Sequence, residues 1–161
     1  MPLLIKDRAV VADEWTTAEV FAPGAAKVIL PLAEYIKAIA AGAPAASTAV
    51  LLKPEEHDLA PLLPYVAQLP LIAAYFGSTG EGRGYTQARL LRERHGYKGE
   101  LRAMGKIRVD QVYLLARCGF DAFELLDGED PVLAIAQLGR FSVAYQPGVD
   151  GLTHPRRRYG G

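Results

Sequence analysis

The chain has a single cysteine among its 161 residues, so it cannot form a disulfide within itself. This scarcity is typical of proteins from a reducing compartment. Long apolar runs are also missing, and none approaches the ~20 residues that a membrane span needs. The opening "MPLLIKDRAVVADEW" has no basic stretch followed by a long apolar one, so no signal peptide is predicted. We therefore expect a cytoplasmic protein with no membrane partner.

The chain also lacks net charge, because its basic and acidic side chains balance at pH 7. The balance is uneven along the sequence: residues 83–108 carry eight basic and two acidic side chains, whereas the flanking regions are acidic. Proteins that bind nucleic acid usually present a wider basic surface. We therefore expect no nucleic-acid partner, and the basic segment instead predicts a local site for a small anion.

Metal and cofactor motifs are absent as well. The three histidines, at positions 57, 95 and 154, have no neighbours at metal-ligand spacing. No cofactor fingerprint is evident, so a redox reaction would need a centre supplied by another protein.

The composition is that of an ordinary globular protein, with half of the residues hydrophobic and 22% charged. A chain of this length is large enough to bury a core in one domain. We expect a single α/β domain over residues 1–147. The last residues, 148–161, are predicted to form an extended or flexible tail.

Apolar runs of strand length alternate with amphipathic segments of helical spacing. Strands are predicted at 48–53, 71–76, 100–104, 121–126 and 141–145. Helices are predicted at 29–41, 58–69, 84–96, 107–119 and 130–139. Asp130 is predicted as the N-cap of the last helix, and Gly96, Gly119 and Gly139 are predicted to end their helices. Residues 3–15 are predicted to form a short hairpin with Asp7 and Arg8 at its turn.

This alternation predicts βαβ units and a mainly parallel sheet of about five strands, with helices packed on it and a short N-terminal β-hairpin before it. Five strands are too few for a complete eight-stranded barrel. An open doubly wound sheet and a fragment of a barrel are both compatible with the pattern.

The stretch "GSTGEGRGYTQARLLRER", from Gly77 to Arg94, joins a predicted strand to a predicted helix. Helix N-termini at the carboxyl ends of parallel strands attract anions. Arg83 and Gly84 stand where a phosphate-binding loop needs Lys and then Ser or Thr, so a nucleoside triphosphate site is disfavoured. A site for a smaller anion and a turn that merely begins a helix remain as alternatives.

Polar side chains on the two following helices extend this hypothesis. Arg89 and Arg92 share one flank of the first helix with Tyr85 and could clamp an anion. On the second helix the apolar face is predicted to consist of Ile107, Leu114, Leu115 and Cys118. Gln111 falls in the middle of this face and is predicted to be mostly buried near the loop. From their positions in the sequence, the residues predicted to bind a ligand are Arg83, Gly84, Arg89, Arg92, Arg102, Asp110 and Gln111. A different possibility is an acid–base site at the strand ends, formed by Lys53 and Glu124 with Arg102.

The run "GRGYTQARLLRERHGYKGELRAMG", followed by "DQ" and "RCGFDAFEL", spans Gly82 to Leu125. This signature resembles the uncharacterised bacterial family called domain-of-unknown-function family 934. The upstream pieces "KDRAVVADEW", "LPLAEYI" and "LIAAYFG" are similar in position and type. Members of that family are commonly encoded beside assimilatory sulfite reductase and are often labelled as oxidoreductases of sulfite reduction. The family's pattern also falls on Gln87, so the resemblance adds Gln87 to the residues predicted to bind a ligand. The resemblance implies a pathway, and it names no reaction.

Three functions follow as hypotheses. The first is an accessory protein of assimilatory sulfate and sulfite reduction, which binds a small anion or an anionic cofactor at the basic segment and assists sulfite reductase. The second is an enzyme with a barrel-like acid–base site at its strand ends. The third is a structural partner that binds no ligand.

Overall fold

The computed structural model describes residues 2–56, 58–78 and 82–139. Its strands are β1 (Leu3–Lys6), β2 (Ala9–Val11), β3 (Thr16–Thr17), β4 (Val28–Pro31), β5 (Thr48–Leu52), β6 (Leu71–Phe76), β7 (Glu100–Ile107) and β8 (Ala122–Leu125). Its α-helices are α1 (Leu32–Ala40), α2 (Arg83–Glu93), α3 (Val112–Cys118) and α4 (Pro131–Gly139). None of the helices in these ranges is both long and apolar enough to cross a membrane.

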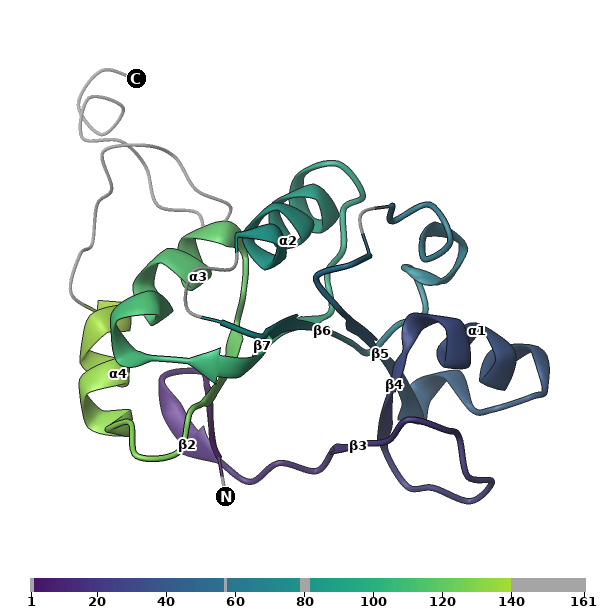
Figure 1. Ribbon diagram of the computed structural model, residues 1–161, viewed down its shortest axis with the longest axis horizontal. Coiled ribbons are helices and arrows are strands. Elements are labelled where there is room, and N and C mark those ends of the chain that lie inside the picture. Colours follow the sequence, from purple (N-terminus) through teal and green to yellow (C-terminus); the bar gives the residue numbers. More distant parts are fainter. Residues whose placement is uncertain (1, 57, 79–81, 140–161) are drawn as a thin grey trace.

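The strands form one sheet in the order β2-β1-β8-β7-β6-β5-β4-β3. Neighbours from β3 to β8 are parallel, while β1 pairs antiparallel with both β8 and β2. The sheet curls, and the four helices lie on its outer, convex side (Figure 1). The predicted α/β class and the mainly parallel sheet are confirmed.

The predicted number of about five strands is wrong, because the described residues form eight. The hairpin strands β1 and β2 join the same sheet, and β3 and β4 were not predicted. The start of the predicted helix 29–41 belongs to β4, whose Val28, Ile29 and Leu30 are all buried. An unbroken apolar run is typical of a parallel strand that is covered on both faces, and short runs of this kind are easily taken for helix.

Two predicted helices also differ from the structure. The segment 58–69 contains turns and a single 3-10 turn at Leu63–Tyr65, because Pro61 and Pro64 have no N–H to donate within a helix. The predicted helix 107–119 starts later, since β7 continues to Ile107 and a 3-10 turn precedes α3. This delay changes the helical phase, so Leu114 is exposed where burial was predicted.

Several local features agree with the prediction. Asp7 and Arg8 both have positive φ, as the turn of a two-residue β-hairpin requires. The Asp130 carboxylate accepts a hydrogen bond from the Val132 N–H at 2.8 Å and so caps α4. The left-handed Gly119 ends α3.

Buried apolar side chains lie on both faces of the sheet, because successive strand residues point to opposite sides. Val50, Leu52 and Ile72 belong to the large cluster shared with the helices. A smaller cluster on the concave side contains Ile29, Ala49, Leu71, Ala73 and Met104, with Trp15 packed against it. The concave side is therefore partly filled by side chains.

The two edges of the sheet are joined directly by the chain. Strands β2 and β3 stand at opposite ends of the strand order, yet only residues 12–15 separate them. We call residues 12–15 the strap, and it crosses the open side of the curled sheet (Figure 1). Its Trp15 packs into the concave apolar cluster, so the strap is anchored to the interior.

The predicted strand 141–145 and the tail 148–161 lie outside the described residues. The predicted domain, residues 1–147, likewise extends beyond them.

Candidate functional site

A cavity of about 620 Å³ lies at the carboxyl ends of the parallel strands. We call it the strand-end cavity. Its lining residues are Thr17, Glu19, Leu51, Lys53, Pro54, Glu55, Tyr75, Gly77, Met104, Gly105 and Glu124. In parallel α/β folds ligands bind at this end of the strands, where the connecting loops meet. The fold therefore brings both Lys53 and Glu124, predicted as a strand-end pair, to one cavity.

The strand alternation explains how these side chains reach the cavity. Lys53 directly follows β5, two residues after Leu51, which packs against the concave apolar cluster. Arg102 pairs with Ala122 across β7 and β8, so Glu124 lies two residues farther along the same face. Met104 is on that face as well, and its thioether side chain lines the cavity.

Glu124 is half-buried, and burial raises the pKa of its carboxyl group. The negative charges of Asp13 and Asp127 raise this pKa further, while the guanidinium of Arg102 opposes the shift. A carboxyl group in this environment can hold a proton at higher pH than an exposed glutamate. Such a group is suited to general acid–base chemistry.

The ammonium group of Lys53 lies 3.7 Å from the Glu19 carboxylate, and both side chains are substantially exposed. The backbone N–H of Lys53 donates to the Glu56 carboxylate at 2.6 Å. Burial raises the pKa of Glu56, and the hydrogen bond from the Lys53 backbone opposes the shift. Lys53 therefore sits at the start of a turn whose backbone is held in place, while its side chain lines the cavity and is 42% exposed.

Helix α2 fixes this turn from the other side. The Gln87 amide is buried and donates to the carbonyl of Glu56 at 3.0 Å. A guanidinium nitrogen of Arg83 donates to the carbonyl of Pro54 at 3.0 Å. Two residues predicted to bind a ligand therefore contact the loop that carries Lys53, at one wall of the strand-end cavity.

A buried ion cluster lies deeper on the concave side. The Arg102 side chain is 2% exposed, and its guanidinium is 2.9 Å from the carboxylates of both Asp13 and Glu100. Lys6 adds a second cation, 2.7 Å from Glu100. The cluster ties the strap, through Asp13, to the middle of β7.

Small neighbours make room for the Arg102 side chain. Its partners across the adjacent strands are Ala73 and Ala122. Since a buried charge is tolerated only when paired and hydrogen-bonded, both acids are needed to keep Arg102 in this position.

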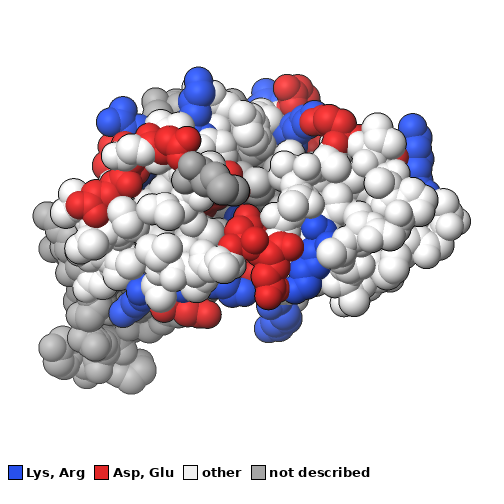
Figure 2. Space-filling model, turned by 90° about the horizontal axis from the view of Figure 1, so that it is seen from below, with Lys and Arg blue, Asp and Glu red and all other residues white. Residues whose placement is uncertain are grey.

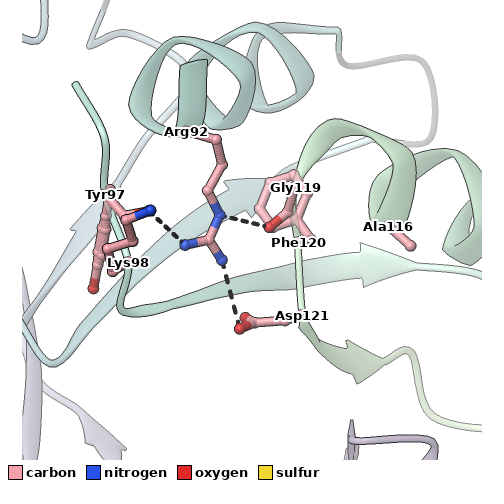
Figure 3. A pocket seen from close by; sticks show the side chains of 7 residues that line it. All are labelled: Arg92, Tyr97, Lys98, Ala116, Gly119, Phe120 and Asp121. Atoms are coloured by element: carbon pink, nitrogen blue, oxygen red, sulfur yellow. Dashed lines mark hydrogen bonds and ion pairs between the residues drawn. The ribbon is translucent and has the colours of Figure 1, made fainter. Parts of the chain in front are cut away.

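Arg92 lies in a second cavity of about 620 Å³, between α2 and the segments that lead into β7 and β8 (Figure 3). Its guanidinium donates to the carbonyls of Tyr97, Gly99 and Gly119 at 2.8, 2.8 and 3.0 Å. It is also 3.5 Å from the Asp121 carboxylate. Burial raises the pKa of Asp121.

These contacts place the donors of Arg92 on backbone carbonyls at the amino ends of the strands, opposite the strand-end cavity. The side chain therefore holds two loops together, the one between α2 and β7 and the one between α3 and β8.

The other predicted residues are spread over the outer layer. Gly84 packs against Phe76, and a Cβ atom at Gly84 would lie 2.3 Å from the Phe76 ring. Arg89 is paired with Glu93 on the solvent side of α2, and Asp110 is exposed. Gln111 is half-buried, accepts from the backbone N–H of Arg108 at 2.9 Å and hydrogen-bonds with the Tyr85 side chain.

The structure thus divides the predicted residues between two sides of the sheet. Lys53 and Glu124 share the strand-end cavity, Arg102 lies in the ion cluster on the same concave side, and Arg83 and Gln87 hold a wall loop. Arg89, Arg92, Asp110 and Gln111 belong to the helical layer. On the face in Figure 2 acidic and basic side chains are interspersed, so that face has no broad basic surface.

Sequence reasoning missed several residues of the concave side. Tyr75 and Met104 could have been found, because they alternate with outward-facing Ala74 and Ala103 in predicted strands. Glu19 and Asp13 carry no such signal, since both lie in irregular segments near the N-terminus that reach the site only through the tertiary fold.

The fold makes this an α/β protein. It has one curled, mainly parallel sheet, with a cavity of ligand size at the carboxyl ends of its strands. The chain belongs to the family described as bacterial protein of unknown function (DUF934), whose model matches residues 49–155. No curated protein and no solved structure gives a significant match. Lys53 and Glu124 lie within the matched range, whereas Asp13 and Glu19 precede it.

The raised pKa of Glu124 leads to a testable pH dependence. A carboxyl group with a raised folded-state pKa stabilises the fold below its unfolded pKa, and this contribution is lost as pH rises through the folded pKa. Glutamine has no proton to lose. Glu124→Gln is therefore expected to be more stable than the parent protein at neutral pH, with the gain vanishing below the ordinary glutamate pKa of about 4.3.

Chemical denaturation at several pH values measures this difference. Glu93→Gln on the solvent side of α2 is the matched control and should show a much smaller pH-dependent change. A Glu124→Gln effect that is the same at every pH would contradict the raised pKa.

Proposed function

We propose that the protein binds a small organic molecule in the strand-end cavity and that Glu124 and Lys53 act on it. Glu124 serves as general acid–base, and the Lys53 ammonium stabilises negative charge that develops on the ligand. The observation that carries the proposal is the meeting of these two side chains, from β8 and the end of β5, in one cavity at the carboxyl ends of the strands.

The surroundings of the cavity support this assignment. Leu51 and Met104 provide an apolar lining, while a small number of polar groups converge on the same space, as in known ligand sites. Gln87 and Arg83 act as positioning residues, because they hold the loop on which Lys53 stands. The ion cluster around Arg102 keeps the strap closed over the concave side.

The chain provides a natural reporter for this cavity. It has only two methionines, Met1 and Met104, and Met104 lines the cavity. In protein labelled with ¹³C at the methionine methyl groups, low-molecular-weight fractions of a bacterial extract are expected to shift the Met104 signal. The shift should be lost in Glu124→Gln and retained in Glu93→Gln. If no fraction moves the Met104 signal, the proposed function is wrong.

For the pathway, we propose a role as an accessory protein of assimilatory sulfite reduction, with sulfite reductase as partner. The support is the resemblance of the Gly82–Leu125 signature to a family encoded beside that enzyme. A deletion strain should grow on cysteine but grow poorly on sulfate and on sulfite. Unimpaired growth on sulfate would rule out this role.

We also propose a separate site for a small anion at the basic segment, residues 83–108. It is supported by the local excess of Lys and Arg and by the N-terminus of α2, which starts in this segment. Sulfite or sulfate at millimolar concentration should raise the melting temperature, because a ligand that binds the native state stabilises it. Arg83→Gln should abolish the rise, with ionic strength held constant by chloride. An equal rise in parent and variant would place the anion elsewhere.

A further inference from the structure

We infer that the strand-end cavity takes a small molecule that carries a protonated amine on a short apolar chain. This inference rests on the proposed function and deepens it, because it names the chemical class of the ligand. It is argued from the charges that line the cavity, from its apolar lining and from how its carboxylates are spaced.

Negative charge dominates the lining. Three carboxyl groups, those of Glu19, Glu55 and Glu124, face one ammonium group, that of Lys53. Lys53 is within ion-pair distance of Glu19. Within the described ranges neither Glu55 nor Glu124 forms an ion pair. The cavity therefore attracts a cation, whereas a free anion such as sulfite would meet an excess of like charge.

The apolar lining argues that this cation has a carbon chain. Leu51 and Met104 face the cavity beside the ring of Tyr75, which is 40% exposed. An aromatic face attracts an ammonium group, and a methionine side chain adapts its shape to a flexible apolar ligand. A bare inorganic cation would leave these surfaces unused.

The geometry of the acidic residues also disfavours a metal ion. Among the described residues no group of three or more His, Cys, Asp or Glu side chains converges closely enough to hold one. The three carboxyl groups of the cavity are therefore spread over its walls. An organic molecule can place its amine against one carboxylate while its chain lies along Met104.

A matched set of probes tests the inference. Butylamine, butyrate and 4-aminobutyrate share a four-carbon skeleton and differ in charge. Each is titrated into protein labelled at the methionine methyl groups, with pH and ionic strength constant. Butylamine is expected to shift the Met104 signal at millimolar concentration, and butyrate is expected to leave it unchanged. The response to 4-aminobutyrate reports whether Lys53 also accepts a carboxylate on the ligand.

Variants of the lining residues show which carboxylates contact the bound amine. Glu55→Gln and Glu124→Gln should each weaken butylamine binding by roughly tenfold, since hydrogen bonds to charged groups are stronger than neutral ones. Lys53→Met should not weaken it, because it removes a like charge. Denaturation monitored by the single tryptophan, Trp15, verifies that every variant is folded.

Two results would overturn the inference. A Met104 shift with butyrate that equals or exceeds the shift with butylamine would show that the cavity prefers anions. The cavity would then still bind ligands, so the proposed function would survive. No shift with butylamine would also reject the amine, and the extract titration described above would then decide separately whether the cavity binds any small molecule.

Discussion

Arg102→Met is expected to lower the free energy of unfolding by ~3–5 kcal/mol, because it removes the buried cation that two carboxylates share and leaves Asp13 without its ion-pair partner. Asp13 and Glu100 both lose a partner at 2.9 Å. The Glu100 side chain is only 11% exposed and keeps the Lys6 ammonium at 2.7 Å, whereas Asp13 keeps no such partner among the described residues. Methionine fills a similar length of space, so the effect is mainly electrostatic. Denaturation by urea measures the loss.

Arg89→Met is the matched control. It removes a guanidinium that is also paired with a glutamate, but in solvent on α2, where such pairs contribute ~0.3–0.5 kcal/mol. The double variant Arg102→Met/Asp13→Asn should recover part of the lost stability, since it removes the carboxylate that Arg102→Met leaves without its cation. If Arg102→Met and Arg89→Met lose equal stability, the buried cluster does not stabilise the strap as described.

Gly105→Ala is expected to lower the free energy of unfolding by about 3 kcal/mol, the combined effect of a left-handed backbone and a steric overlap. Gly105 has a φ of +98°. A Cβ atom there would lie 2.4 Å from the carbonyl oxygen of Phe76 on the neighbouring strand. Backbone atoms of a paired strand cannot rotate away, so β6 and β7 would have to separate.

The difference between Gly105→Ala and Gly128→Ala measures the steric part of this effect. Gly128 has a similar φ of +92°, but a Cβ atom there would meet no atom within 4 Å. Gly128→Ala should therefore lower the free energy of unfolding only by the backbone contribution, ~1–2 kcal/mol. Equal losses in the two variants would mean that the contact with Phe76 is relieved without cost. Gly105 also lines the strand-end cavity, so Gly105→Ala should weaken ligand binding there as well.

The candidate site was partly predictable. Lys53 and Glu124 could be placed at strand ends because parallel strands bring their carboxyl ends to one edge of a sheet. Gln87 was assigned to a ligand through its place in the signature, and the structure shows that it binds the loop of Lys53. Glu55 immediately precedes Glu56 in that loop, and nothing in its local sequence indicates that it lines a cavity.

The amino-acid sequence by itself determined the features that depend on near neighbours. The Asp7-Arg8 turn, the Asp130 cap of α4 and the alternation that makes the sheet mainly parallel all follow from local conformational preference and hydrophobic spacing. Each involves residues only a few positions apart, so the physical cause is readable along the chain.

Only the tertiary structure decided the number of strands, the path of the strap and the partners of Arg102. A strand of two residues such as β3 shows no periodicity and exists because β4 lies beside it. Arg102 is paired with Asp13, 89 positions away, because the curled sheet brings the strap over β7. Such contacts arise from the packing of the whole chain, where burial and desolvation decide which distant charges meet, and local sequence carries no record of them.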